Sequence, residues 1–164
     1  MTETERKFLI VMPDRAQLLS MESATESEIL QTYLLSENGG STRVRSRTTN
    51  GKTAYTHTEK FRLSTLSCTE KEAKISKDRY LELLKKADPS RHSILKTRIT
   101  FPYADHLMEI DIYPFWKNQA VLEIELASEG EAFDIPSFLH VIREVSEDAR
   151  YKNRALARNI PSEG

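Results

Sequence analysis

Acidic and basic side chains recur two residues apart along several short stretches of the sequence. Glu3, Glu5 and Lys7 form the first such stretch, and Arg43 and Arg45 belong to the next. Neighbouring carboxylates offer hard oxygen ligands that suit Mg2+ or Mn2+, whereas guanidinium and ammonium groups bind phosphate oxygens. Together these residue types predict a site for a polyphosphate and divalent cations, where a metal-bound water or a metal-polarised phosphorus supplies the reactivity.

A spacing of two is typical of β-strands, because successive side chains of a strand point to opposite faces. Apolar or small residues fill the gaps, as Leu122 and Ile124 do beside Glu123. The turn-forming pair Asn50-Gly51 separates two of the stretches. We expect seven strands with a charged face, at residues 3–7, 43–47, 52–61, 70–74, 96–101, 108–113 and 121–126.

Helices are expected between or after these strands. Residues 76–88 begin at a serine suited to an N-cap and carry apolar residues at helical spacing. A shorter helix is expected after Pro13, another from about Pro136, and a strongly basic one over residues 148–159. The apolar stripe of the helix after Pro136 consists of Phe138, Leu139, Ile142 and Val145.

The charged strand faces lie either against water or around a polar lumen, once helices cover the apolar faces. For a single strand, a solvated charged face is the ordinary arrangement. Two observations favour a lumen for the whole set. Bases and paired acids are segregated by strand, as a site for a polyanion and divalent cations requires, and a closed sheet of about eight strands removes its edges and encloses one small ligand. Alternation alone does not establish closure.

The composition limits the classes of function. Among 164 residues, 24 Lys and Arg nearly balance 25 Asp and Glu, so the chain lacks the basic excess of a general nucleic-acid binder. The length suits one domain, residues 1–164, with one sizeable core. The lone Cys68 permits no internal disulfide, and four scattered His form no zinc-like cluster, so we expect oxygen ligands for any metal.

The distribution of apolar residues argues against a membrane protein. No apolar run approaches the roughly 20 residues that span a bilayer. The first ten residues, MTETERKFLI, carry acids where a signal peptide has a basic start. We therefore expect a cytoplasmic protein without membrane or nucleic-acid partners.

The charged strands also match a family. Residues 3–7 read ETERK, the ExExK form that opens the CYTH domains, also called triphosphate tunnel metalloenzymes. ExExK alone recurs by chance on surface strands, but nine further elements follow in the family's order across almost the whole chain, which therefore resembles this family. These elements are QTYL at 31–34, RVR at 43–45, TEK ending at Lys60, ExE at 70–72, KTR at 96–98, EIDIY around Asp111, EIE at 123–125, EVSED from Glu144 and RYKNRAL from Arg150.

The resemblance implies an α+β fold, in which helices pack outside a closed eight-stranded antiparallel β-barrel, the triphosphate tunnel. It implies that inorganic triphosphate (tripolyphosphate) is hydrolysed to pyrophosphate and phosphate with Mg2+ or Mn2+ as cofactor, because short bacterial members that open with MTExERKFL and end near RYKN look most like inorganic triphosphatases. The implied metal ligands are Glu3, Glu5, Asp111, Glu123 and Glu125, with Glu72 as a weaker one. The implied phosphate-binding residues are Lys7, Arg43, Arg45, Lys60, Lys96 and Arg98, and the implied catalytic residues are Glu5, Lys7 and Lys96.

Other functions stay open on the same scaffold. They are a class IV-like adenylate cyclase, a nucleoside or thiamine triphosphatase, and a non-enzymatic module that binds polyphosphate or nucleotide. In each case the partner is a triphosphate-bearing small molecule, and a homodimer is compatible with the sequence.

Several residues have two interpretations. Arg47 and Glu109 continue the phase of the charged faces and lie either in the lumen or at its edge. Tyr33 is a lid aromatic or a core residue, and Glu144 belongs to the EVSED element or to a structural salt bridge. The basic tail closes the tunnel or is solvated. We interpret Trp116 as a packing residue.

Overall fold

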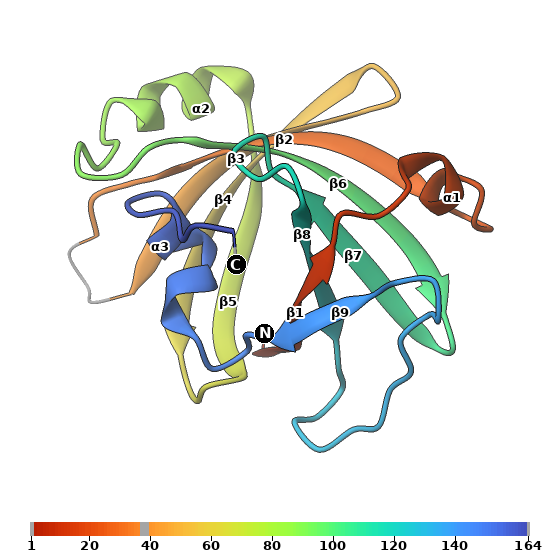
Figure 1. Cartoon of the computed structure of the whole chain (residues 1–164). Helices are drawn as coiled ribbons and strands as arrows, with labels where there is room; N and C mark the ends of the chain where they lie inside the picture. The colour runs from red at the N-terminus through yellow and green to blue at the C-terminus, as the bar shows by residue number, and fades with distance from the viewer. Residues whose placement is uncertain (1, 37–39, 164) are drawn as a thin grey trace.

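The computed structural model describes residues 2–36 and 40–163, and its strands form one antiparallel sheet closed on itself. The order of neighbouring strands is β5-β4-β3-β2-β6-β7-β8-β1-β9, and a further pairing of β5 with β1 closes the barrel (Figure 1). The prediction of a closed eight-stranded antiparallel barrel is confirmed, with β9 as an additional strand. The strands are β1 (Thr2–Val11), β2 (Thr25–Tyr33), β3 (Ser41–Thr49), β4 (Lys52–Arg62), β5 (Ser67–Ile75), β6 (Ile94–Tyr103), β7 (His106–Ile112), β8 (Gln119–Glu125) and β9 (Val141–Glu144).

Strand β1 changes partner along one of its edges. Its first residues, Thr2 to Thr4, pair with β5, whereas Phe8 to Ile10 pair with β9. On its other edge β1 pairs continuously with β8, from Glu5 opposite Glu125 to Val11 opposite Gln119. The first half of this edge of β1 therefore closes the barrel by pairing with β5, and the second half pairs with the additional strand β9.

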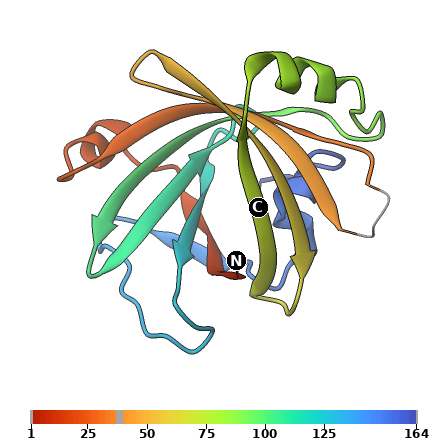
Figure 2. The ribbon, with the colours of Figure 1, turned by 180° about the vertical axis from the view of Figure 1, so that it is seen from behind.

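Two of the predicted helices are confirmed. Helix α1 (Arg15–Leu19) begins after Asp14, whose side chain accepts a hydrogen bond from the Ala16 backbone N–H. Helix α2 (Lys77–Leu84) begins after Ser76, which caps it in the same way by accepting from the Arg79 N–H. Helix α2 lies on the convex side of the sheet (Figure 2), where its buried apolar residues cover the outward side chain of Val44.

The helix predicted after Pro136 is wrong, because part of this segment forms β9. Its apolar stripe is divided: Leu139 is buried against the outer face of the barrel, whereas Ile142 is 49% exposed. The free upper edge of β1 offers unpaired backbone groups, and residues 141–144 pair with it as a strand. Apolar spacing could not reveal this competing backbone partner.

The basic tail is helical only in short turns. A 3-10 turn at Ala149–Tyr151 and helix α3 (Asn153–Leu156) are separated by the extended residue Lys152. A continuous helix over 148–159 was therefore also a wrong prediction. The sheet curves around this C-terminal segment, drawn in blue on the concave side (Figure 1).

The apolar residues form an outer core and an inner plug. The outer core lies between the sheet and residues that include Leu18 of α1 and Leu139 of the following loop. The inner plug contains Leu9, which shares the inward phase of Lys7 on β1, together with Trp116 and Leu156. The interpretation of Trp116 as a packing residue is confirmed. The C-terminal segment thus fills one end of the lumen, and polar residues occupy the rest.

Candidate active site

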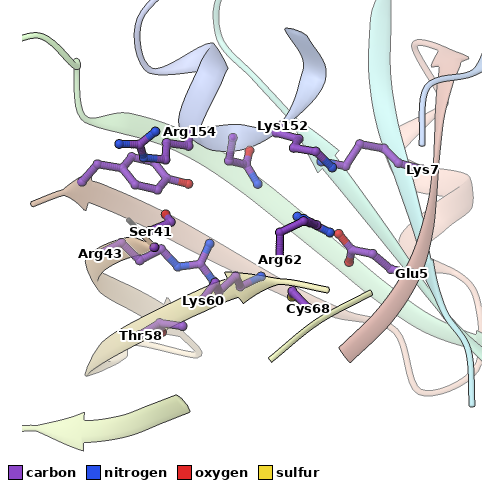
Figure 3. A pocket seen from close by; sticks show the side chains of 13 residues that line it. Glu5, Lys7, Ser41, Arg43, Thr58, Lys60, Arg62, Cys68, Lys152 and Arg154 are labelled. Carbon is purple, nitrogen blue, oxygen red and sulfur yellow. The ribbon is translucent and has the colours of Figure 1, made fainter. Parts of the chain in front are cut away.

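A polar cavity of about 220 Å³ opens into the lumen beside the C-terminal segment. Glu5 and Lys7 reach it from β1, Arg43 from β3 and Lys60 from β4, while Lys152 reaches it from the C-terminal segment (Figure 3). These residues are far apart in the sequence, and the closure of the barrel brings them together. The alternation that predicted inward side chains is therefore correct for four of the site residues.

The basic wall of the lumen contains the guanidinium groups of Arg43 and Arg45, whose Nε atoms are buried and which are only partly hydrogen-bonded. The side chain of Arg43 donates no hydrogen bond from its buried Nε atom to any described residue, and the same is true of Arg45 Nε. Burial, and then the neighbouring Arg43, lower the pKa of Arg45 to about 10. The nearest carboxylate oxygen of Glu72 lies 3.6 Å from Arg45 Nη2. Such crowded cations with free N–H donors are suited to a multiply charged anion.

The acidic wall gathers around the start of β1. Glu5 lies opposite Glu125 in the pairing of β1 with β8, and Lys7 lies opposite Glu123. Burial, and then the Glu123 carboxylate, raise the pKa of Glu5 to about 8. Glu123 stays ionised, because Lys7 and Arg98 hold its pKa well below the ordinary value against the effect of burial.

This acidic wall fits a divalent cation. Glu123 Oε1 is buried and accepts no hydrogen bond from the described residues, although Lys7 Nζ lies 3.4 Å away. Burial, and then the negative charge of Glu123, favour the protonated form of Glu5, and a bound cation would offset both effects. Hard carboxylate oxygens suit Mg2+ or Mn2+. Within residues 2–36 and 40–163, no three acidic, His or Cys side chains already stand in a metal-binding arrangement.

Glu3 and Cys68 lie at the end of the acidic wall where β1 meets β5. Lys60 Nζ donates to Glu3 Oε2 at 2.8 Å, and this ammonium group lowers the pKa of Glu3 although burial opposes the change. The Cys68 thiol is 3.5 Å from the same carboxylate oxygen and lines the cavity. Glu3 is thus paired with a phosphate-binding candidate, and the two walls meet here.

A buried ion network lies apart from the residues that line this cavity. Asp111 is fully buried, and its two oxygens accept from Lys96 Nζ at 2.8 Å and from Arg98 at 2.8 and 2.9 Å. Arg98 also donates to Glu109 at 2.7 Å, so of its two interpretations Glu109 has the one that places it in the lumen. Arg47 joins this region through a bond from its Nε to Ser27 Oγ at 3.0 Å. The structure thus brings Lys96, Arg98 and Asp111 together as mutual partners, and the assignment of Asp111 to a metal stays a prediction.

Burial and the neighbouring charges together shift the pKa values of the groups in this network. Burial lowers the pKa of Lys96 to about 7. Arg98 and Lys96 hold the pKa of Asp111 at about 2, against the effect of burial. Asp111 is therefore a fixed anion at neutral pH, and Lys96 can gain or lose a proton at Nζ.

The C-terminal segment supports Lys7 from behind. The Lys7 backbone N–H donates to Ser146 Oγ at 2.8 Å, and Lys7 Nζ donates to the Tyr151 carbonyl at 3.2 Å. Ser146 Oγ in turn donates to Glu144, which pairs with Arg6 on the outer side of β1. Glu144 therefore has the structural role that was one of its two interpretations.

Sequence reasoning missed or left undecided several residues of the cavity. Arg62 lines it and continues the phase of Lys60 on β4, a signal that the alternation contained. Tyr33 lines the cavity and is buried. Lys152 and Arg154 line it as well, so the basic tail forms one of its walls. Their positions depend on how the tail folds back into the barrel, which no local pattern reveals.

A closed antiparallel barrel with segregated acids and bases in its lumen defines the class of triphosphate tunnel, or CYTH, proteins. An inorganic triphosphatase of Nitrosomonas europaea is 33% identical to the chain over 165 residues, covering 98% of this chain and all of the relative. The chain therefore belongs to the inorganic triphosphatase family within this class.

Solved structures agree with this assignment. The crystal structure of the inorganic triphosphatase NE1496 matches 99% of this chain and 98% of its own, with 30% identity and a TM-score of 0.59. The PH1819 protein from Pyrococcus horikoshii shares the fold at 19% identity and a TM-score of 0.59, over 78% of this chain and 80% of its own. No model in a scan of protein families matches the chain. None of the described helices is long and apolar enough to cross a membrane.

Proposed function

We propose that this protein is a divalent-metal-dependent triphosphatase that hydrolyses tripolyphosphate to pyrophosphate and phosphate inside the barrel. The observation that carries the proposal is the pair of buried guanidinium Nε atoms, on Arg43 and Arg45, that have no protein partner in the described chain. They lie in the same lumen as the carboxylates of Glu5 and Glu123. A site for an anion alone would not require the carboxylates, and a site for a metal alone would not require the arginines. The two sets in one lumen therefore support a metal-bound polyanion as the ligand.

The basic residues bind and orient the substrate. Arg43 and Lys60, which line the cavity, and Arg45, which shares the inward face of β3 with Arg43, hold the phosphate oxygens, and Lys7 does so from β1. Charge-assisted bonds from several fixed donors hold a flexible triphosphate in one conformation, so that water meets the terminal phosphorus in line with the leaving pyrophosphate.

The acidic residues supply the metal site. Glu3, Glu5, Glu123 and Glu125 would hold Mg2+ or Mn2+, which when bound offsets the charge of the phosphates and polarises the reacting phosphorus. Before that, Glu5 holds a proton that it must release, because its pKa is about 8. A role of Lys96 in positioning the attacking water stays a prediction, because its side chain is fully buried against Asp111 and does not line the cavity.

The size of the cavity favours an inorganic substrate over a nucleotide. Its volume of about 220 Å³ is below the roughly 300–1,000 Å³ of pockets that enclose organic ligands. The plug around Trp116 and Tyr151 fills the lumen beyond the charged residues. An adenine ring therefore has no enclosed place beside a bound triphosphate, which argues against the cyclase alternative. Dimer formation and a cytoplasmic location stay predictions.

Two variants test the assignment of the site. Glu5→Gln and Lys7→Ala are each expected to abolish most phosphate release from tripolyphosphate with Mg2+ or Mn2+, while the melting temperature shows that the fold is retained. Glu82→Gln is the matched control, because this glutamate is on α2 with a side chain 64% exposed. Near-normal turnover in both site variants would overturn the assignment. A protein whose melting temperature rises with tripolyphosphate but which releases no phosphate under any metal condition would be a binding module instead.

A further inference from the structure

A second cavity, of about 320 Å³, lies beside the last turn of the chain and outside the proposed active site. It shares no lining residue with the tunnel cavity. The loop after α2 contributes Arg91, the 3-10 turn contributes Arg150, and the chain after α3 contributes Arg158, Ile160 and Pro161. Three guanidinium groups thus meet at one hollow that the triphosphatase reaction does not use.

The arginines of this cavity are not fully paired by the protein. Arg91 has a side chain only 8% exposed, and its Nε atom is buried without a hydrogen-bond partner among the described residues. Its nearest acid is Asp88, at 3.6 Å from Nε. Burial, and then the nearby Arg154 and Arg158, lower the pKa of Arg91, so positive charge is crowded here. A buried guanidinium N–H that lacks an acceptor is costly unless a ligand or water satisfies it.

Arg158 is the cation most open to a ligand. Its Nη2 atom donates to the hydroxyl of Ser90 at 2.7 Å, and no ion pair with it is found in residues 2–36 and 40–163. Arg150 differs, because it already forms a close pair with Asp148 at 2.6 Å. Arg91 Nη1 donates to the Arg154 carbonyl, so the donors left for a ligand are the Nε of Arg91 and the remaining N–H groups of Arg158.

The remaining wall of the cavity is apolar. Ala155, Ile160 and Pro161 line it, with Asn159 as the one polar residue beside them in the lining, and Ile160 is 47% exposed beside the arginines. An inorganic anion has no use for such a surface, whereas a flat ring can pack on it and against a guanidinium plane. The combination is suited to a molecule that carries one phosphate and one planar apolar group.

We propose that this cavity is a binding site for a nucleoside monophosphate or a similar aromatic phosphate ester. The phosphate is held by Arg91 and Arg158, and the ring packs on Ile160 and Pro161. The site is separate from the tunnel, since α3 lies between them: Asn153 and Arg154 line the tunnel cavity, whereas Ala155 lines this one.

Binding of AMP, measured by isothermal titration calorimetry without divalent metal, tests the proposal. Wild-type protein is expected to bind one AMP, and Arg158→Glu and Ile160→Asp are each expected to weaken binding about tenfold or more. Arg79→Glu, at an exposed arginine of α2, is the matched charge-reversal control and is expected to bind as the wild type does. Melting temperatures confirm that each variant is folded.

Two further titrations separate this cavity from the tunnel. Lys60→Ala, which alters the tunnel, is expected to leave AMP binding unchanged, and inorganic phosphate or adenosine alone is expected to bind at least about tenfold more weakly than AMP. The proposal is overturned if AMP does not bind, if Arg158→Glu binds it as tightly as Arg79→Glu does, or if Lys60→Ala removes the binding. Equal affinity for inorganic phosphate and AMP would contradict the role of the apolar wall.

Discussion

Removal of the Asp111 carboxylate is the sharpest perturbation that the buried ion network allows. Asp111 is 0% exposed, and it accepts hydrogen bonds from Lys96 and Arg98 at 2.8 to 2.9 Å. Asp111→Ala would leave buried cations without their main acceptor, a loss that typically costs about 3–5 kcal/mol of unfolding free energy. Arg98 keeps Glu109 as a partner at 2.7 Å, so we expect Asp111→Ala to lower the unfolding free energy by about 3 kcal/mol.

Urea unfolding at pH 7, in metal-free buffer, measures this loss directly. Asp134→Ala, at an exposed acid, is the control and is expected to change stability by less than about 0.5 kcal/mol. Lys96→Met combined with Asp111→Ala is expected to cost at least about 1 kcal/mol less than the sum of the single variants, because the pair is removed together. Additive costs, or an Asp111→Ala loss below about 1 kcal/mol, would refute the network as a source of stability.

Three further outcomes follow from the structure. Ser76→Ala removes the side-chain acceptor of the Arg79 N–H, so the free energy of unfolding is expected to fall by about 1 kcal/mol in chemical denaturation, whereas no change would contradict the capping role. Glu144→Ala breaks the partly exposed pair with Arg6, and less than about 1 kcal/mol is expected by the same method; a loss above about 3 kcal/mol would show a larger role. Burial, and then Arg62, lower the pKa of Lys152 to about 8 in the fold, so the unfolded chain binds more protons than the native one and stability is expected to rise between about pH 8 and 10.5. Lys152→Met is expected to flatten that rise in thermal unfolding curves, and an unchanged slope would contradict the assignment.

The barrel and its inward residues could be predicted because a period of two is a local property of the chain. Glu3 and Glu5 alternate with outward residues on β1, and the same alternation places Arg43 and Arg45 on the inner face of β3. Since one face of each strand must be buried or enclosed, the pattern also fixes which side chains share the lumen. Closure itself rests on the short pairing of Thr2 to Thr4 with β5, which alternation does not reveal.

The remaining features depend on contacts between distant segments. Residues 141–144 became a strand because the edge of β1 offered backbone partners, although their apolar spacing favours a helix. Likewise, Asp111 was predicted as a metal ligand on the lumen face, whereas its engagement by Lys96 and Arg98 depends on side-chain geometry across β6 and β7. Sequence patterns define the composition of the lumen, and tertiary packing decides which of its charges are already paired.

We propose that the lumen binds an inorganic triphosphate together with a divalent metal. The most direct measurement is the release of phosphate from tripolyphosphate, ATP, thiamine triphosphate and pyrophosphate, each with Mg2+, with Mn2+ and with EDTA, compared as kcat/KM. The structure predicts fastest turnover of tripolyphosphate, loss of that turnover in EDTA, and no cyclic AMP from ATP. Faster turnover of ATP than of tripolyphosphate, or undiminished turnover in EDTA, would contradict it.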